Sequence, residues 1–509
     1  MNIFKVYTGR LIDLVKKNQK FLEIENNNNF KGIIVEAPPE EFNFHLSCNI
    51  SMVLAKINKL NPKLLADKMK PLILDKFKDV SSVEIAGPGF INLRLSNESI
   101  RDIILEVFKE GSTFGSNNEN KKYNVEFVSA NPTGPMHVGH CRGAVFGDVL
   151  SNLLKFNGNN VTKEYYINDY GNQIKNFTKS VFLRIREIIH GEKFINAVDL
   201  YPGEYIIEIS KKIIKEKKGW SFNNFEDIYN ELSKESLKHS MQMIINDLER
   251  LGIKHDNFFS EKKLIEQNLV KKTVDNLKEK ALVVEGFLEA PKGEENTNWK
   301  KKKRLIFKAT IFGDDADRSL QKNDGTWTYF ANDIAYHADK VSRNYDNLIN
   351  ILGADHIGYI KRITAAVNAL SNNKVNLNCK VCQLVKLYKN GTPFKMSKRA
   401  GDFISASDLL NEVDKDSIRF MMLNRSNDVE LDFDFTKVLE KSKDNPVFYV
   451  QYCQARINSL FRTLNSNVND SITLDNTSFS LNEYEDKIFR KILEWQKIIE
   501  ISSKKLEPH

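Results

Sequence analysis

Two histidines on one short stretch of the chain could bind the phosphates of a nucleotide. His137 and His140 close the segment SANPTGPMHVGH (129–140), in which a proline- and glycine-rich turn precedes an expected helix start. Side chains three positions apart share one face of a helix, and the first turn of a helix offers N–H groups to an anion. Imidazoles there can donate hydrogen bonds to charge that builds on an attacked phosphate. Gly139 leaves room for a base or a ribose. Taken alone, the motif supports equally well a helix that merely begins with polar capping residues.

A second segment could hold a pyrophosphate leaving group. LYKNGTPFKMSKRAGD (387–402) has a predicted hairpin turn at Asn390-Gly391. The run after the turn contains Lys395, Met396, Ser397 and Lys398. Lysines are point charges on flexible stems, so they can follow phosphates as a loop closes. If this run stood alone, a solvated basic loop would be the favoured interpretation.

The pattern around the histidines predicts a βαβ unit that positions them. YNVEFVSA (123–130) is a short apolar run suited to a buried parallel strand. Apolar residues recur at helical spacing over 138–156, and the strand-like segment NVTKEYYIND follows. Strand, turn, helix and strand open a doubly wound sheet, which puts the chain in the α/β class. Further strands are predicted in RLIFKATIF (304–312), NLINILGAD (347–355) and KVCQLVKLY (380–388).

The remaining segments predict additional domains. Residues 1–112 have the pattern of a small α+β unit with a strand hairpin over 80–96. Residues from about 175 to 300 are highly charged and mostly helical, which predicts an insertion that splits the nucleotide-binding fold. A connecting helical segment is expected over 401–440, and a helical bundle over 441–509.

Composition limits the classes of protein. A chain of 509 residues predicts two to four domains, and its net charge of +8 permits binding to an anionic polymer. Five cysteines are an odd number, so a disulfide framework is disfavoured and a reduced setting fits better. Cys379 and Cys382 form a CxxC without a second ligand pair, which favours structural cysteines over a metal site. The sequence has no signal peptide pattern and no apolar run of transmembrane length, so we expect a cytoplasmic protein.

These features together resemble a known enzyme family. HVGH and KMSK look like the HIGH and KMSKS signatures of class I aminoacyl-tRNA synthetases. The closest resemblance is to bacterial-type arginyl-tRNA synthetase, through the segments EFVSANPTGPMHVGHCRGA, YYINDYGNQI, TYFANDIAYHADK, LGADHIGY and NPVFYVQYCQARI. The resemblance covers nearly the whole chain and is strong over 123–462. It implies a Rossmann-like catalytic domain over 113–400, a tRNA-contacting additional domain over 1–112, a stem-contact segment over 401–440 and an anticodon-binding bundle over 441–509.

The resemblance also implies which residues form the site. Catalysis would use His137, His140, Lys395 and Lys398. ATP would contact Pro132, Gly134, His137, Gly139, His140, Lys395, Met396, Ser397 and Lys398. Arginine would contact Glu126, Asn131, Tyr329, Asp333, Asp355 and His356. A guanidinium requires carboxylates in bidentate geometry, which suits Glu126 and Asp333. The alternatives are a strand-edge salt bridge for Glu126 and a helix-start charge for Asp333.

The implied activity is that of an arginine–tRNA ligase. It would make arginyl-adenylate from L-arginine and ATP with Mg²⁺, without a tightly bound protein-ligated metal, and pass the arginyl group to the terminal adenosine of tRNA(Arg). The family default is a monomer.

Tyr452 and Arg456 could stack on and neutralise anticodon nucleotides, although a helix with core aromatics and solvated arginines is an equal alternative. The rivals are a lysine- or glutamate-specific synthetase of the same class, an HxGH nucleotidyltransferase and a catalytically silent RNA-binding protein. Acidic pocket candidates disfavour glutamate.

Two departures from the family are visible in the sequence. Lys398, the second lysine of KMSK, is often absent from the family but is present here, so the loop should resemble that of the wider class. The chain also stops at SSKKLEPH, where the family continues into further apolar helices. Either the C-terminal bundle is truncated or the native protein is unusually short, and the departure favours truncation.

Overall fold

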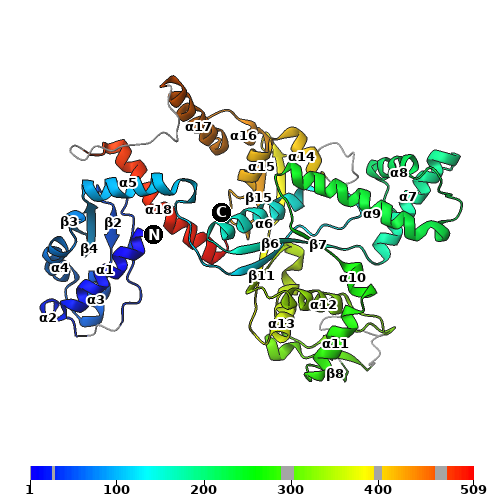
Figure 1. Ribbon diagram of the computed structural model, residues 1–509, viewed down its shortest axis with the longest axis horizontal. Coiled ribbons are helices and arrows are strands. Elements are labelled where there is room, and N and C mark those ends of the chain that lie inside the picture. Colours follow the sequence, from blue (N-terminus) through cyan, green and yellow to red (C-terminus); the bar gives the residue numbers. More distant parts are fainter. Residues whose placement is uncertain (1, 26–28, 288–302, 395–403, 465–478) are drawn as a thin grey trace. The chain divides into compact units, whose positions relative to one another are not determined.

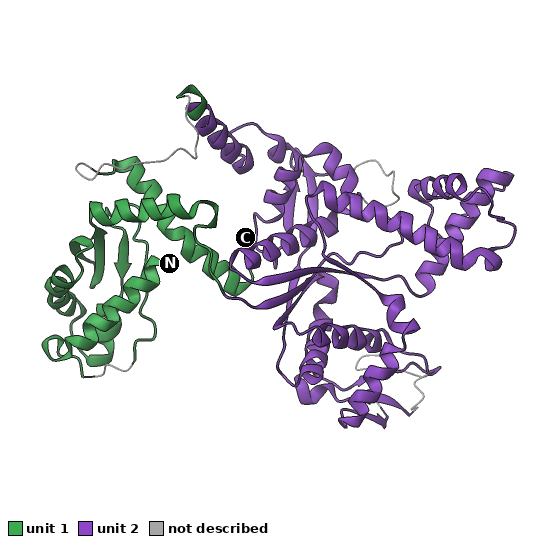
Figure 2. Ribbon diagram, in the orientation of Figure 1, with its two compact units in different colours: residues 1–118, 461–506 green, residues 119–460, 507–509 purple. Residues whose placement is uncertain are grey.

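The chain forms two compact units. The computed structural model describes residues 2–25, 29–287, 303–394, 404–464 and 479–509. One unit consists of Met1–Asn118 with Phe461–Leu506, and the other of Glu119–Leu460 with Glu507–His509 (Figure 2). None of the helices in these described ranges combines the length and the apolar character needed to cross a membrane.

The first unit contains a four-stranded antiparallel sheet in the order β1-β2-β4-β3. Its strands are β1 (Val35–Glu36), β2 (Leu46–Cys48), β3 (Val80–Ala86) and β4 (Phe90–Leu95). The hairpin predicted over 80–96 is confirmed: Gly87 and Gly89 in its turn have φ of 53° and 133°, which glycine adopts without strain. The helices are α1 (Ile3–Lys17), α2 (Gln19–Leu22), α3 (Ile50–Asn58), α4 (Pro62–Lys76) and α5 (Asn97–Glu110).

A helix from the other end of the chain completes this unit. Helix α18 (Glu483–Lys505) places Phe489 and Leu493, one turn apart, in the same core as the N-terminal strands and helices. The buried His45 also bonds through Nε2 to Asp486 Oδ1 at 2.9 Å. This differs from the prediction of one bundle over 441–509, because the apolar stripe of α18 is covered by N-terminal residues.

The second unit is built on a five-stranded parallel sheet in the order β12-β11-β5-β6-β7. The strands are β5 (Lys122–Glu126), β6 (Asn160–Ile167), β7 (Asn257–Ser260), β11 (Asn347–Gly353) and β12 (Asn376–Cys382). In chain order this is the 3-2-1-4-5 arrangement of a doubly wound fold. In Figure 1, helix α6 (Val138–Phe156) lies on one side of the sheet, and α12 (Tyr329–Ser342) and α13 (Ile360–Ser371) lie on the other. The predicted βαβ unit and the α/β class are confirmed.

The predicted insertion is only partly helical. It contains α7 (Asn172–His190), α8 (Glu204–Glu216), α9 (Phe225–Arg250), α10 (Glu261–Glu266) and α11 (Leu269–Glu279). Strand β7, however, lies within it and forms the edge of the parallel sheet. The strand predicted in 304–312 exists as β9 (Arg304–Phe307), but it pairs with β8 (Val283–Gly286) and β10 (Arg318–Ser319) in a separate antiparallel sheet.

The predicted Asn390-Gly391 turn is confirmed. It joins β13 (Val385–Lys389) to β14 (Thr392–Pro393), and both turn residues have positive φ, of 54° and 72°. Two such residues match the right-handed twist of a two-residue hairpin. Strand β15 (Leu431–Asp434) pairs with β13 in parallel. The neighbouring helices are α14 (Ala406–Glu412), α15 (Lys415–Met422), α16 (Phe435–Leu439) and α17 (Pro446–Thr463).

Candidate active site

The strand order of the parallel sheet reverses between β5 and β11. Glu126 is the last residue of β5, and its register partner on β11 is Asn350. In doubly wound sheets a ligand binds outside the carboxyl ends of the strands at this switch point. The predicted histidines and carboxylates converge on the same edge, because the chain leaves β5 there and enters α6 through the HVGH turn.

The two histidines form one unit at the start of α6. His137 is the N-cap residue, and its backbone N–H donates to Nδ1 of His140 at 3.3 Å. Their rings stack with centroids 3.7 Å apart. Burial lowers the pKa of His137, and burial together with His137 lowers the pKa of His140 to about 3. At neutral pH both imidazoles are therefore neutral, and each can still donate one hydrogen bond.

The turn before the histidines is closely packed. Pro132 and Thr133 are buried, and the Thr133 carbonyl accepts a hydrogen bond of 3.0 Å from the Tyr205 hydroxyl. A Cβ on Gly134 would approach that hydroxyl to 3.1 Å, and a Cβ on Gly139 would approach His137 Cε1 to 2.8 Å. A side chain at either glycine would therefore disturb the packing of this turn.

The predicted lysine run lies outside the described residues, which stop at Phe394 and resume at Ile404. This applies to Lys395, Met396, Ser397 and Lys398. On the C-terminal side of the run, the Ile404 carbonyl accepts from the Val138 N–H at 2.9 Å, and the Ala406 N–H donates to the Met136 carbonyl at 2.7 Å. The segment that follows KMSK is therefore hydrogen-bonded to the backbone on both sides of His137.

Three carboxylates lie close enough to influence one another beside the switch point. Burial raises the pKa of Asp333 to about 7, and the charges of Glu126 and Glu261 add to the rise. The Tyr359 hydroxyl, which donates to Asp333 Oδ2, and Lys340 oppose it. Burial also raises the pKa of Glu261. Largely desolvated carboxylates gathered in this way favour the binding of a cation.

Two of these residues were not predicted as site residues. Glu261 directly follows the short strand β7, and its Oε1 accepts from Asn332 Nδ2 at 3.1 Å. If β7 had been predicted from the sequence, Glu261 would have been expected at the same sheet edge as Glu126. Tyr359 belongs to the segment LGADHIGY, in which Asp355 and His356 were predicted as site residues instead.

Glu126 is held by a buried lysine. Lys340 Nζ on α12 donates to Glu126 Oε2 at 2.5 Å and to Asn350 Oδ1 at 3.1 Å. The amide Nδ2 of Asn350 bonds to His337 Nε2 at 3.0 Å, and His337 Nδ1 bonds to the Asp333 carbonyl at 2.8 Å. The salt bridge that was the alternative interpretation of Glu126 is thus present, with its partner inside the site.

The other predicted arginine contacts have different neighbours. Asn131 Oδ1 accepts from Asn168 Nδ2 at 2.9 Å. After β11, Asp355 Oδ2 and His356 Nε2 lie 3.3 Å apart, and both side chains are exposed. Tyr329 is 78% exposed, and its ring lies 5.3 Å from Lys322 Nζ. The structure brings Glu126 and Asp333 together, whereas these four residues have contacts elsewhere on the rim.

The predicted tRNA contacts are exposed. Tyr452 on α17 is 51% exposed and stacks on Phe448 with ring centroids 6.2 Å apart. Arg456 is also exposed. The aromatic ring of Tyr452 is therefore accessible rather than part of a core, which leaves its contact with RNA a prediction.

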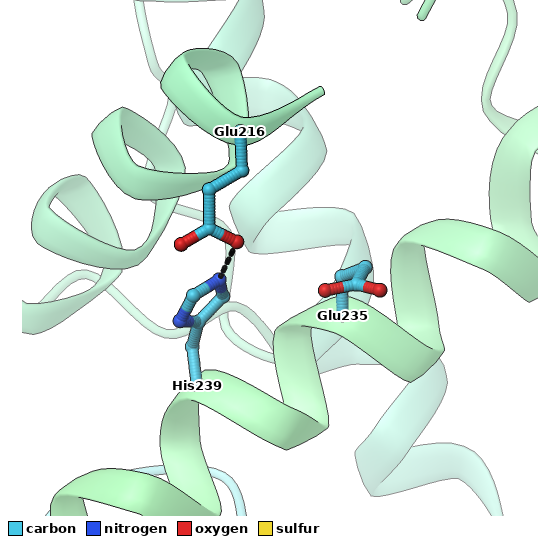
Figure 3. A group of neighbouring side chains, drawn as sticks. All are labelled: Glu216, Glu235 and His239. Atoms are coloured by element: carbon cyan, nitrogen blue, oxygen red, sulfur yellow. Dashed lines mark ion pairs between the residues drawn. The ribbon is translucent and has the colours of Figure 1, made fainter.

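One group of side chains has the spacing of metal ligands. Among the described residues, Glu216, Glu235 and His239 have ligand atoms within 4.8 Å of one another (Figure 3). His239 Nε2 lies 3.2 Å from Glu216 Oε2. Glu235, however, already pairs with Lys217 at 3.0 Å and Lys238 at 3.4 Å. Two ammonium groups offset its charge, so we assign these residues to an ion-pair network between α8 and α9.

Comparison with known proteins covers both units. Residues 103–461 match the family described as tRNA synthetases class I (R), catalytic domain, and residues 10–95 match the arginyl tRNA synthetase N terminal domain. The chain is 54% identical over 512 residues to an arginine–tRNA ligase of Pelagibacter ubique (strain HTCC1062), covering 100% of this chain and 89% of that protein. It is 43% identical over 517 residues to an arginine–tRNA ligase of Ruegeria pomeroyi, covering 100% and 88%.

Solved structures of arginyl-tRNA synthetases are also similar to this chain. An arginyl-tRNA synthetase crystal structure from Campylobacter jejuni superposes with a TM-score of 0.70 at 32% identity, covering 81% of this chain and 86% of that one. The Thermus thermophilus arginyl-tRNA synthetase gives a TM-score of 0.70 at 18% identity over 99% of this chain and 88% of that one, which supports the fold.

Proposed function

Because this chain belongs to the arginyl-tRNA synthetase family and is a class I arginine–tRNA ligase, we propose that the carboxylates at its switch point bind arginine beside histidines that bind ATP. The observation that carries the proposal is Asp333, a half-buried carboxylate whose pKa is raised to about 7 next to Glu126 and Glu261. A desolvated carboxylate among like charges gains most from a guanidinium, which supplies a permanent charge and paired N–H donors. Asp333 and Glu261 therefore bind the guanidinium. Glu126, whose charge is paired with Lys340, binds the amino acid end with Asn131 instead of the guanidinium for which the sequence suggested it.

Arginine activation then follows from positioning and charge. The arginine carboxylate oxygen attacks the α-phosphorus of ATP, which enters as its magnesium complex, and the bond to pyrophosphate breaks. His137 and His140, both neutral, donate hydrogen bonds to the phosphate oxygens as charge builds on them. Lys395 and Lys398 offset the charge of the departing pyrophosphate. The products are arginyl-adenylate and pyrophosphate, and no covalent enzyme intermediate is required.

Transfer to tRNA completes the reaction. A ribose hydroxyl of the terminal adenosine of tRNA(Arg) attacks the arginyl carbonyl carbon, loses its proton, and AMP leaves with the bonding electrons. Tyr452 and Arg456 on the exposed helix α17 suit contact with unpaired nucleotides. The N-terminal segment 1–112 contributes a further tRNA contact. We expect a monomer that works in the cytoplasm, as the family resemblance implies.

The experiment that tests the proposal is ATP–pyrophosphate exchange with each of the twenty amino acids, with and without total tRNA. The assigned pocket is supported if Asp333→Asn loses exchange at the arginine concentration that suffices for the wild type and regains it at high arginine concentration. Exchange with arginine that is unchanged in Asp333→Asn overturns the pocket while the enzyme class stands. Exchange with lysine alone would overturn the substrate.

A further inference from the structure

Lys340 is buried between the two strands that flank the switch point, and it does not face solvent: its side chain is 0% exposed. Its ammonium group makes two hydrogen bonds and lies beside an aromatic ring. Nζ reaches Glu126 Oε2 at 2.5 Å and Asn350 Oδ1 at 3.1 Å, and it lies 4.6 Å from the centre of the Tyr336 ring. Two buried hydrogen bonds and a ring contact restrict the position of this ammonium group.

The partners of Lys340 are themselves fixed. The Tyr336 hydroxyl donates to Glu164 Oε1 at 2.7 Å, and Glu164 is buried. The Asn350 amide is oriented by its second bond, from Nδ2 to His337 Nε2. His337 then reaches the backbone carbonyl of Asp333 through Nδ1. A continuous chain of contacts therefore runs from Glu126 through Lys340 to the backbone of Asp333.

We infer that Lys340 is a positioning residue for arginine: it holds the Glu126 carboxylate in place, and thereby sets the affinity for arginine without contacting it. This inference rests on the arginine pocket proposed above. Glu126 Oε2 is taken by Lys340, while Glu126 Oε1 has a long contact of 3.4 Å with the Ser129 hydroxyl. Oε1 is thus the oxygen that can accept from the substrate, and its direction depends on the bond at Oε2.

Lys340 also separates the charges of the pocket. The charge of Glu126 raises the pKa of Asp333 and the charge of Lys340 lowers it, so the lysine offsets part of the repulsion between the two carboxylates. With it, Glu126 and Lys340 form a neutral pair, so the charge offered to a guanidinium is that of Asp333 and Glu261. The lysine therefore determines how the pocket divides its carboxylates between the two ends of arginine.

The test compares Lys340→Met, Glu126→Gln and the double variant in aminoacylation assays that give kcat and the KM of arginine and of ATP separately. We expect Lys340→Met to raise the KM of arginine about tenfold or more and to change the KM of ATP by less than about twofold. Because Lys340 acts through Glu126, adding Lys340→Met to Glu126→Gln should change the KM of arginine by less than about twofold. Full additivity of the two substitutions would overturn the inference.

Lys163→Met is the matched control. Lys163 is also a buried lysine of the second unit that binds a carboxylate and an asparagine, Asp148 at 2.6 Å and Asn152 at 2.9 Å. Lys163→Met should lower the melting temperature without changing the ratio of the KM of arginine to the KM of ATP. If Lys340→Met and Lys163→Met behave alike, Lys340 has only a structural role.

Two further outcomes keep the inference separate from the proposed function. If Lys340→Met does not fold, the double variant still decides, because it leaves no unpaired buried charge. A KM of arginine in the double variant equal to that of Glu126→Gln supports the inference, and a clearly higher one contradicts it. If Glu126→Gln and Asp333→Asn both leave the KM of arginine unchanged, the proposed pocket is wrong and the inference falls with it.

Discussion

Arginine binding should be coupled to a proton at Asp333. The pKa of this carboxyl is raised from 3.8 to about 7, first by burial and then by Glu126 and Glu261, against the opposing effects of Tyr359 and Lys340. Only the ionised form pairs with a guanidinium, so affinity rises with pH through the folded-state pKa and levels off above it. Between pH 8 and pH 6 the association constant should fall about tenfold, because the ionised fraction falls from most of the protein to about one tenth.

The same shift has a consequence for stability. The difference between a pKa of about 7 and one of 3.8 corresponds to about 4 kcal/mol, and it is the cost of keeping Asp333 ionised in the folded, arginine-free protein. The folded pKa is raised, so this cost is present above pH 7 and disappears as pH falls towards 4. Asp333→Asn should therefore raise the melting temperature at pH 8 more than at pH 5, while it weakens arginine binding.

Isothermal titration of arginine into the protein without ATP measures the coupling directly. At pH 7, titrations in buffers of different ionisation enthalpy should show release of about half a proton for each arginine bound, because a group at its pKa is half protonated. Asp333→Asn should release none. Wild-type affinity that is flat between pH 6 and pH 8, or proton release that persists in Asp333→Asn, would refute the assignment of the coupled group.

Three other substitutions test the packing around the site and in the first unit. Gly139→Ala brings a methyl group within 2.8 Å of His137 Cε1 and should lower the ATP–pyrophosphate exchange rate about tenfold, whereas Gly143→Ala, whose nearest neighbour lies at 3.9 Å, should change it little. Arg142 is buried and donates to the carbonyls of Gln383, Ser426 and Val429 at 2.9, 2.8 and 2.7 Å. Calorimetry of Arg142→Met should therefore show a loss of about 3 kcal/mol of unfolding free energy. An unchanged free energy of unfolding would contradict this role. The pKa of Asp486 is lowered by hydrogen bonds from His45 and Arg490, which outweigh burial, so its contribution is present above its ordinary pKa and lost as pH falls. Asp486→Asn should thus lower the melting temperature at pH 7 but make little difference at pH 3, and an equal effect at both values would show that the charge is not the cause.

Prediction from the sequence was most accurate where a single residue pattern determines the local structure. The apolar run 123–130, the turn and the periodic segment 138–156 could be recognised because strand, turn and helix each have their own pattern. Strand β7 was missed because NFFS has only four residues and lies among charged helices. The pairing of Glu126 with Lys340 could not be predicted, because it joins residues 214 positions apart and depends on how α12 crosses the sheet. The packing of α18 with the N-terminal core is hidden for the same reason.

The turn between Glu126 and the histidines connects the proposed arginine-binding and ATP-binding groups at one strand end. The Ser129 N–H donates to the Phe127 carbonyl at 3.1 Å, and Val128 between them has a φ of 73°, a conformation that a β-branched residue adopts only under strain. Contacts with β6 hold the turn: the Tyr166 N–H donates to Ser129 Oγ at 3.0 Å, and the Tyr165 hydroxyl donates to the Ala130 carbonyl at 2.8 Å.

This strained turn reverses the chain within a few residues. Phe127 is buried against Gly147 of α6, where any Cβ would overlap its ring, so the helix can approach the end of β5 closely. Glu126 consequently faces the edge shared with Asp333, while the chain beyond Ala130 leads to His137 at the start of α6. A relaxed, longer turn would separate the carboxylate from the histidines. The strained backbone at Val128 thus belongs to a short turn that keeps the proposed arginine-binding and ATP-binding groups near one another, as attack of one substrate on the other requires.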